Sequence, residues 1–180
     1  MNIKQSVTGY DIILNRFTKE KQSMIRRWRN DPKISQYMEY QKEISLDQQL
    51  AWFDKTNNDF NLYYIVVYNG VESGVINIKD ISEDYHTGEA GIYIYEDRFL
   101  NTDISYRAHI VLFDYVFLEL GLKNITSKIQ ETNTRACRFA AFLGSNLLES
   151  NNGYTHWNLS KEDYLNNKNR LRFINRYNKK

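Results

Sequence analysis

Runs of apolar residues, some alternating with polar residues and some continuous, predict a chain of short strands and helices. Patterns rich in β-branched and aromatic residues predict strands at 10–17, 62–68, 71–81, 90–95, 124–130, 146–148 and 154–159. Apolar positions at helical spacing predict helices at 19–28, from 45 onward, at 104–120 and at 134–143. The predicted order is β-α-α-β-β-β-α-β-α-β-β, which indicates an α/β fold.

Local signals support several of these boundaries. Asn69 and Gly70 form the dipeptide most typical of a tight hairpin, between the strands at 62–68 and 71–81. Ser45 and Gln48 have the spacing of a capping box, which predicts a helix start at Ser45. Pro32 disfavours a helical conformation for the residue before it, so we expect the first helix to end there.

Composition narrows the class of protein. The chain has 180 residues, of which 42% are hydrophobic and 26% charged, as in a globular protein with one domain. The net charge of +2 is too small to indicate nucleic-acid binding. Residues 1–17 hold no long apolar run, so we expect neither a signal peptide nor a membrane span. We expect a domain over residues 1–160 and a polar, basic tail over 161–180.

Cysteine and histidine usage excludes two kinds of site. Cys137 is the only cysteine, so no intramolecular disulfide forms, and no zinc-like Cys/His spacing is present. These features indicate a reducing, cytoplasmic setting and no metal. His86, His109 and His156 are scattered, and we expect each to be structural or exposed.

Residues 88–144 resemble the core of the GNAT N-acetyltransferases. Residues 113–122 look like the end of their central helix, and residues 127–133 look like their fifth strand, which ends on an asparagine. The front half resembles the branch that acetylates ribosomal proteins and nucleotide-linked amino sugars. The similar residues are at 28–32, 38, 44–46 and 52–53. Within that branch the chain is most similar to the acetyltransferases of pseudaminic acid biosynthesis, and the resemblance covers roughly residues 10–160.

The resemblance implies a fold, a reaction and a cofactor. It implies a mixed central β-sheet flanked by helices, and transfer of an acetyl group from acetyl-CoA to a primary amine. The implied amine is the 4-amino group of a UDP-linked amino-deoxy sugar, and the implied assembly is a homodimer. Two alternatives stay open, namely an acetyltransferase for protein N-termini or small amines, and a binding module without catalysis.

The residues expected to bind acetyl-CoA follow from the same resemblance. The amides of Ile92 and Ile94 are expected to polarise the thioester carbonyl, and the phosphates are expected at the start of the helix at 104–120. The full set is Ile92, Tyr93, Ile94, Phe99, Asn101, Thr102, Asp103, Ile104, Ser105, Asn133 and Cys137.

The phosphate loop at 100–105 departs from the glycine-rich pattern of the family. Asp103 is expected to cap the helix, and so to occupy an amide and repel a phosphate. Asn101 can adopt a left-handed conformation in place of a glycine, and Arg98 and Arg107 can supply compensating charge.

Catalytic candidates lie on the sheet. The resemblance places Glu131 as the base that takes the amine proton through water, and Asn77 as the residue that holds this water. A solvated glutamate at a strand end is the competing interpretation of Glu131. Ala140 stands where many relatives carry an acid tyrosine, so the leaving thiolate would rely on solvent, Tyr93 or Tyr95.

Acceptor recognition is expected from the first helices. The expected residues are Arg29, for a phosphate, and Met38 and Tyr40, for a base or ring. The resemblance adds Gln49, which stands where those enzymes carry a histidine. Trp52 is expected in the core, and a core position is the competing interpretation of Trp28 and Met38. A deep, basic, aromatic pocket near Arg29 would favour a nucleotide, whereas an open acidic groove would favour a peptide.

Overall fold

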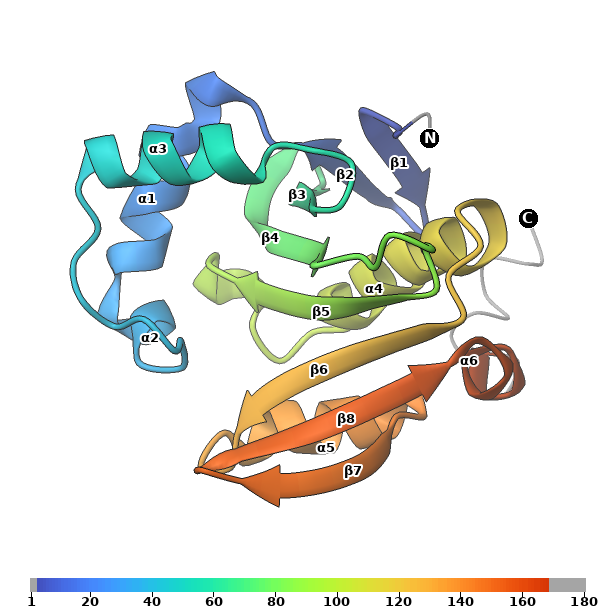
Figure 1. Ribbon diagram of the computed structural model, residues 1–180. Helices are drawn as coiled ribbons and strands as arrows, with labels where there is room; N and C mark the ends of the chain where they lie inside the picture. Colours follow the sequence, from blue (N-terminus) through green and yellow to red (C-terminus); the bar gives the residue numbers. More distant parts are fainter. Residues whose placement is uncertain (1–2, 169–180) are drawn as a thin grey trace.

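An eight-stranded mixed sheet forms the centre of the computed structural model, which describes residues 3–168 (Figure 1). The strand order is β1-β2-β3-β4-β5-β6-β8-β7. The strands are β1 (Ser6–Gly9), β2 (Ile12–Arg16), β3 (Leu62–Tyr68), β4 (Val71–Lys79), β5 (Thr87–Ile94), β6 (Asn124–Gln130), β7 (Asn146–Asn151) and β8 (Tyr154–Ser160). β5 and β6 pair in parallel, and every other neighbouring pair is antiparallel. The expected mixed sheet flanked by helices is therefore confirmed.

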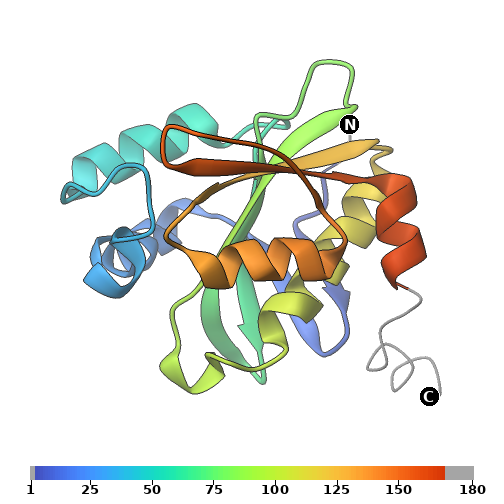
Figure 2. The same ribbon diagram turned by 90° about the horizontal axis from the view of Figure 1, so that it is seen from below.

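Helices cover both faces of this sheet (Figures 1 and 2). One face carries α1 (Gln22–Asn30), the short α2 (Pro32–Ser35) and α3 (Leu46–Thr56). The other face carries α4 (Ile104–Asp114), a π-helical turn (Tyr115–Glu119) and α5 (Thr134–Leu143). Short 3-10 turns at Lys19–Lys21 and Asp97–Phe99 precede α1 and α4, and α6 (Lys161–Lys168) follows β8.

Successive side chains along each strand point to opposite faces of the sheet, and each face has its own apolar core. Tyr64, Ile76 and Ile110 belong to a buried cluster between the sheet and α4. Ile65 and Trp28 belong to a second cluster between the sheet, α1 and α3. Each face therefore has its own apolar support, and the two faces can carry different functions.

The structure adds elements at the start of the chain. β1 was not predicted because its turn uses Tyr10 and Asp11 with φ of 53° and 61°, rather than a glycine hairpin signal. Pro32 ends α1 as predicted but also begins α2, where the Asp31 side chain accepts the Lys33 N–H at 3.0 Å.

The predicted tail begins with α6, an ordered helix. Tyr164 on α6 is 2% exposed, and its ring lies 5.8 Å from Phe113 and 5.2 Å from Phe117. Its hydroxyl donates to the Asp114 carboxylate at 2.8 Å. α6 thus packs against the helix behind the sheet, and the remaining tail residues, 169–180, lie outside the described residues.

Candidate functional site

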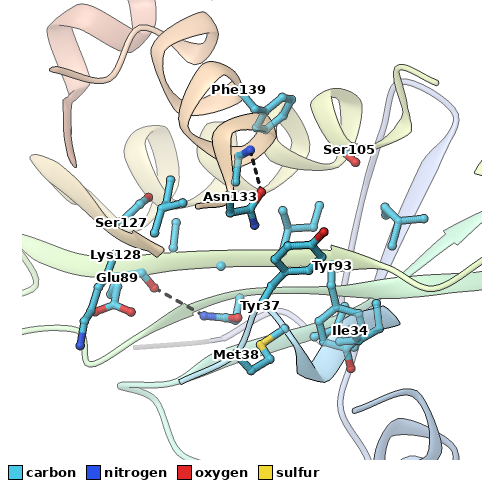
Figure 3. A pocket seen from close by; sticks show the side chains of 18 of the residues that line it. Ile34, Tyr37, Met38, Glu89, Tyr93, Ser105, Ser127, Lys128, Asn133 and Phe139 are labelled. Carbon is cyan, nitrogen blue, oxygen red and sulfur yellow. Dashed lines mark hydrogen bonds between the residues drawn. The ribbon is translucent and has the colours of Figure 1, made fainter. Parts of the chain in front are cut away.

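The sheet divides between β5 and β6. These strands pair only over residues 87–89 and 124–126, although β5 continues to Ile94 and β6 to Gln130. Beyond this contact they diverge, as Figure 1 shows. A cavity of about 1380 Å³ fills the divergence, and its lining side chains come from both faces of the sheet. In Figure 3, Ser105, Asn133 and Phe139 lie on one side of the strands, with Ile34 and Met38 on the other.

Backbone N–H groups of β5 face the divergence. Tyr95 N–H donates to the Ser73 carbonyl of β4 at 2.8 Å, so alternation along the strand turns the Ile92 and Ile94 amides away from β4. Those amides therefore point toward the gap. A Cβ at Gly74 would lie 2.2 Å from the Tyr93 carbonyl oxygen, so the close approach of β4 and β5 requires glycine there.

The half of the cavity next to α4 and α5, the α4–α5 half, has mostly apolar and neutral walls. Its expected members Thr102, Ser105 and Asn133 do line the cavity. The Asn133 side chain also caps α5, because its Oδ1 accepts the Ala136 N–H at 3.1 Å. Positive charge in this half comes from Arg135 and Arg138 on α5, which the sequence analysis did not select.

The phosphate loop corrects the expectation for Asp103. Asp103 makes no side-chain cap, because its carboxylate pairs instead with the Arg107 guanidinium at 2.9 Å, one turn along α4. The Thr102 hydroxyl accepts the Ile104 N–H at 3.4 Å, and Asn101 has a φ of 61°. The Ser105 N–H, next in the first turn, is one of the N-terminal amides that an α-helix does not bond internally, so it can donate to a ligand.

Of the two arginines named for compensating charge, Arg107 pairs with Asp103 and Arg98 pairs with Glu96. Arg107 is held by Asp103 and by Asp11 at 3.5 Å. Arg98 is largely exposed and pairs with Glu96 at 3.4 Å. The pairing with Arg107 offsets the negative charge of Asp103 as expected, so the carboxylate repels an anion less than its sequence position suggests.

Several expected residues lie away from the cavity wall. They are Phe99, Asn101, Asp103, Ile104, Cys137 and Glu131. Glu131 is exposed in the turn after β6, where its backbone N–H donates to the Gly153 carbonyl at 3.0 Å. The Cys137 sulfur packs 3.5 Å from the Thr155 hydroxyl, on the β8 side of α5. The structure therefore does not bring Glu131 and Asn77 together on one wall.

The half of the cavity next to α1, α2 and α3, the α1–α3 half, receives the residues expected to bind the acceptor. Arg29, Met38, Tyr40 and Gln49 all line it, and so does Asn77. Arg29 Nη2 donates to the Tyr40 carbonyl at 2.8 Å and so holds the segment after α2. Gln49 is 4% exposed, and its Nε2 donates to the Gln22 side chain at 2.8 Å.

A carboxylate that the sequence analysis missed lies in this half. Glu89 on β5 pairs with Lys79, its cross-strand partner on β4, at 3.0 Å. Asn77 is on the same face, and its Nδ2 lies 3.5 Å from the Glu89 carbonyl oxygen (dashed line in Figure 3). The period of two along β5 could have identified Glu89, because it places this residue on the face of Gly91 and Tyr93.

Basic and aromatic side chains dominate the α1–α3 half. Its cationic lining residues are Arg29, Lys33, Lys79 and Lys128, whereas its acidic ones are Glu39 and Glu89. Its aromatic residues include Phe17, Tyr37, Tyr40, Trp52, Tyr63 and Tyr93. Trp52, which was expected in the core, lines the cavity and contacts Tyr63 edge-on at 4.9 Å between ring centroids.

Two of the tyrosines in this half have a raised pKa. Burial raises the pKa of Tyr63 to about 12. Burial also raises the pKa of Tyr93 above its usual range, and nearby Arg29 offsets only part of this shift. At neutral pH both hydroxyls are therefore protonated, and neither is a ready proton donor.

Other classes of site receive no support from residues 3–168. Within this range, no three His, Cys, Asp or Glu side chains gather in a way that could hold a metal ion. No helix in the same range is both long and apolar enough to cross a membrane.

Comparison with known proteins identifies the family. The sequence profile of the Acetyltransferase (GNAT) domain matches residues 11–146. No curated protein sequence gave a match.

Solved structures share the fold at low identity. FdhC, described as a nucleotide-linked sugar GNAT, superposes with a TM-score of 0.79 at 16% identity over 93% of this chain and 97% of that one. Spermidine N-acetyltransferase from Vibrio cholerae, solved with CoA and spermine, gives 0.77 at 17% identity over 87% and 99%. Aminoglycoside acetyltransferase AAC(6')-Ib, solved with coenzyme A, gives 0.75 at 13% identity over 87% and 99%. The chain therefore belongs to the GNAT acetyltransferase family, which uses acetyl-CoA as its acetyl donor.

Proposed function

We propose that this acetyltransferase modifies the primary amine of a small, negatively charged acceptor, namely a nucleotide-linked amino-deoxy sugar such as a UDP-4-amino sugar. The observation that carries the proposal is the α1–α3 half of the cavity, with four cationic and two acidic lining side chains among several aromatic ones. Cationic side chains suit a diphosphate, and aromatic rings suit a base or sugar.

The α4–α5 half fits the cofactor. The amides of Ile92 and Ile94 face the gap, and the first turn of α4 offers N–H groups and the positive end of a helix dipole. Arg135 and Arg138 add positive charge for phosphates. Coenzyme A is an elongated molecule with amides in its pantetheine arm and a diphosphate at one end. It therefore matches this order of groups.

We assign the base role to Glu89 in place of Glu131. Glu89 is a carboxylate that lines the α1–α3 half, whereas Glu131 is exposed in a turn outside the cavity. Lys79 at 3.0 Å orients the Glu89 carboxylate, and Asn77 on the same face can hold the amine or a water.

These residues bind and deprotonate the acceptor. The acceptor ammonium loses one proton to Glu89, directly or through one water, and its nitrogen then has a lone pair for attack. Acetyl-CoA would supply the acetyl group, whose carbon bonds to this nitrogen as the carbon–sulfur bond breaks. The nitrogen loses its second proton to solvent, and the leaving thiolate takes a proton from solvent.

No tyrosine acid is part of the proposal. Ala140 is buried on α5 and has no hydroxyl. Tyr95 stacks on Trp28 at 5.2 Å and does not line the cavity, and the raised pKa of Tyr93 makes it a poor donor. Because a thiol with an ordinary pKa near ~8.5 leaves as a thiolate with modest help, solvent suffices to supply the proton.

The charge of the cavity separates this acceptor from the alternatives. A polyamine carries several positive charges, and the α1–α3 half would repel it. A peptide N-terminus would fit an acidic groove, whereas cationic lining residues outnumber acidic ones in this half. FdhC supplies a precedent for a nucleotide-linked sugar on this fold.

The test is coenzyme A release by the purified protein with a panel of UDP- and dTDP-amino sugars, peptides and polyamines. We expect release with an amino sugar nucleotide and with neither peptide nor spermidine. Release with polyamines or peptides alone would refute the proposed acceptor. An unchanged melting temperature at millimolar acetyl-CoA would instead point to a module without catalysis.

A further inference from the structure

A buried histidine lies in the α4–α5 half of the cavity and has no role in the proposed reaction. His109 on α4 is 5% exposed, yet it lines the cavity. Its Nδ1 lies 2.7 Å from the Ser105 carbonyl oxygen, one turn earlier in the helix. A carbonyl oxygen can only accept, so Nδ1 carries the hydrogen and Nε2 carries a lone pair.

The Nε2 atom of His109 is open to the cavity and unpaired. It makes no hydrogen bond with any residue of the described range 3–168. It is also not one of the unpaired polar atoms that the fold seals from solvent. A buried acceptor that the protein leaves unsatisfied, at a cavity wall, is a feature that a ligand N–H or O–H would complete.

The surroundings of His109 keep it neutral. Phe113 and Phe139 each lie 5.1 Å from the imidazole, measured between ring centroids. Burial among these groups lowers the pKa of His109 to about 4, although the hydrogen bond to Ser105 acts in the opposite direction. At neutral pH the ring is therefore an uncharged acceptor and not a general acid.

Backbone groups of β5 offer this half both donors and acceptors, because the N–H and C=O of a strand residue point the same way. The Ile92 and Ile94 amides, the first turn of α4, Arg135 and Arg138 all offer N–H groups. The pantetheine arm of coenzyme A contains amides, and each amide needs an acceptor for its N–H as well as a donor for its carbonyl.

We propose that Nε2 of His109 accepts a hydrogen bond from an amide N–H of the pantetheine arm. His109 is then a positioning residue for the cofactor, set between Phe113 and Phe139 so that its ring cannot turn freely. The inference concerns cofactor binding only and does not depend on which amine is acetylated.

The experiment is calorimetric titration of coenzyme A and of acetyl-CoA into the purified protein without acceptor. His109→Leu removes the acceptor and keeps an apolar side chain, so we expect both dissociation constants to rise about 5- to 30-fold. His109→Gln carries an oxygen near the Nε2 position and should bind within about threefold of the native protein. His86→Leu is the matched control, since His86 is half exposed beside Asp84 and does not line the cavity.

A second comparison keeps the test decisive if the leucine variant does not fold. His109→Asn reaches only the Nδ1 position, so it should bind as weakly as the leucine variant while His109→Gln binds well. Unchanged affinity in both the leucine and asparagine variants would overturn the proposal. A loss for free coenzyme A but not for acetyl-CoA would also overturn it, because the donor would then be the thiol.

Discussion

The two halves of the cavity are built from different kinds of groups. The α4–α5 half offers backbone amides of β5, the first turn of α4 and apolar helix faces. The α1–α3 half offers charged and aromatic side chains that come from α1, α2, α3, the segment after α2 and the four strands β3, β4, β5 and β6. A cavity wall made of backbone groups keeps its hydrogen-bonding groups when side chains are substituted. A wall made of side chains changes its chemistry with each substitution. The comparison explains how one scaffold keeps a cofactor while its acceptors differ.

The phosphate loop illustrates this tolerance. It has no glycine at 100–105, yet Asn101 takes a left-handed conformation and Arg107 offsets the charge of Asp103. The amides at the start of α4 remain in place, because the helix and not the loop composition presents them.

The largest expected effect tests the base of the α1–α3 half. Glu89→Gln removes the carboxylate and keeps the shape, so we expect the rate at neutral pH to fall by about 10²-fold or more. Glu131→Gln is the matched control and should stay within about twofold, because Glu131 is exposed outside the cavity. Steady-state rates with saturating acetyl-CoA measure both.

The opposite pattern of rates would support Glu131, the residue indicated by the sequence resemblance, as the base. A large loss in Glu131→Gln beside a small one in Glu89→Gln would place the base at the end of β6. An equal melting temperature for the two variants is needed before the rates are compared.

A smaller effect tests the charge of the same half. Lys128 on β6 lines the cavity and pairs with Glu39 at 3.0 Å. Lys128→Met should raise the KM of an anionic acceptor about tenfold and leave the KM of acetyl-CoA unchanged. Lys123→Met, an exposed position at the other end of β6, is the control. A lower KM in the Lys128 variant would indicate a cationic acceptor.

The smallest effect tests the charge of the α4–α5 half. Arg138 is exposed at the cavity wall, so its contribution to phosphate binding is screened by solvent. Arg138→Gln should weaken coenzyme A binding about two- to fivefold at low salt, and the difference should disappear near 0.5 M salt. A changed acceptor KM with unchanged cofactor affinity would contradict the assignment of the cofactor to the α4–α5 half and the acceptor to the α1–α3 half.

The sequence was sufficient for most of the fold. Periodicity and turn signals located seven of the eight strands, and the capping box at Ser45 is present with both hydrogen bonds. β1 and α6 were missed for local reasons. β1 is four residues long, and α6 is a polar helix with one fully buried side chain, Tyr164.

The candidate site was less predictable. The strand resemblance selected Ile92 and Ile94, which face the gap because position along β5 alone decides the direction of an amide. Glu89 was missed because its importance depends on the cross-strand register that sets it beside Lys79 and on the face of Asn77. His109 was passed over because a lone histidine on an apolar helix is usually structural, and only its open Nε2 distinguishes it.

The contact between β5 and β6 extends over only three residue pairs. A sheet is stiff where neighbouring strands are hydrogen-bonded along their whole length. Because β5 and β6 are bonded over so short a stretch, the sheet behaves as two plates that are joined at one corner. One plate contains β1 to β5 and the other contains β6, β8 and β7. A ligand that bonds to the edge of β5 and rests against α5 bridges these plates. Binding should therefore slow amide hydrogen exchange in β6 and β8 as well as beside the ligand, so that the bound molecule acts as a brace for the whole sheet.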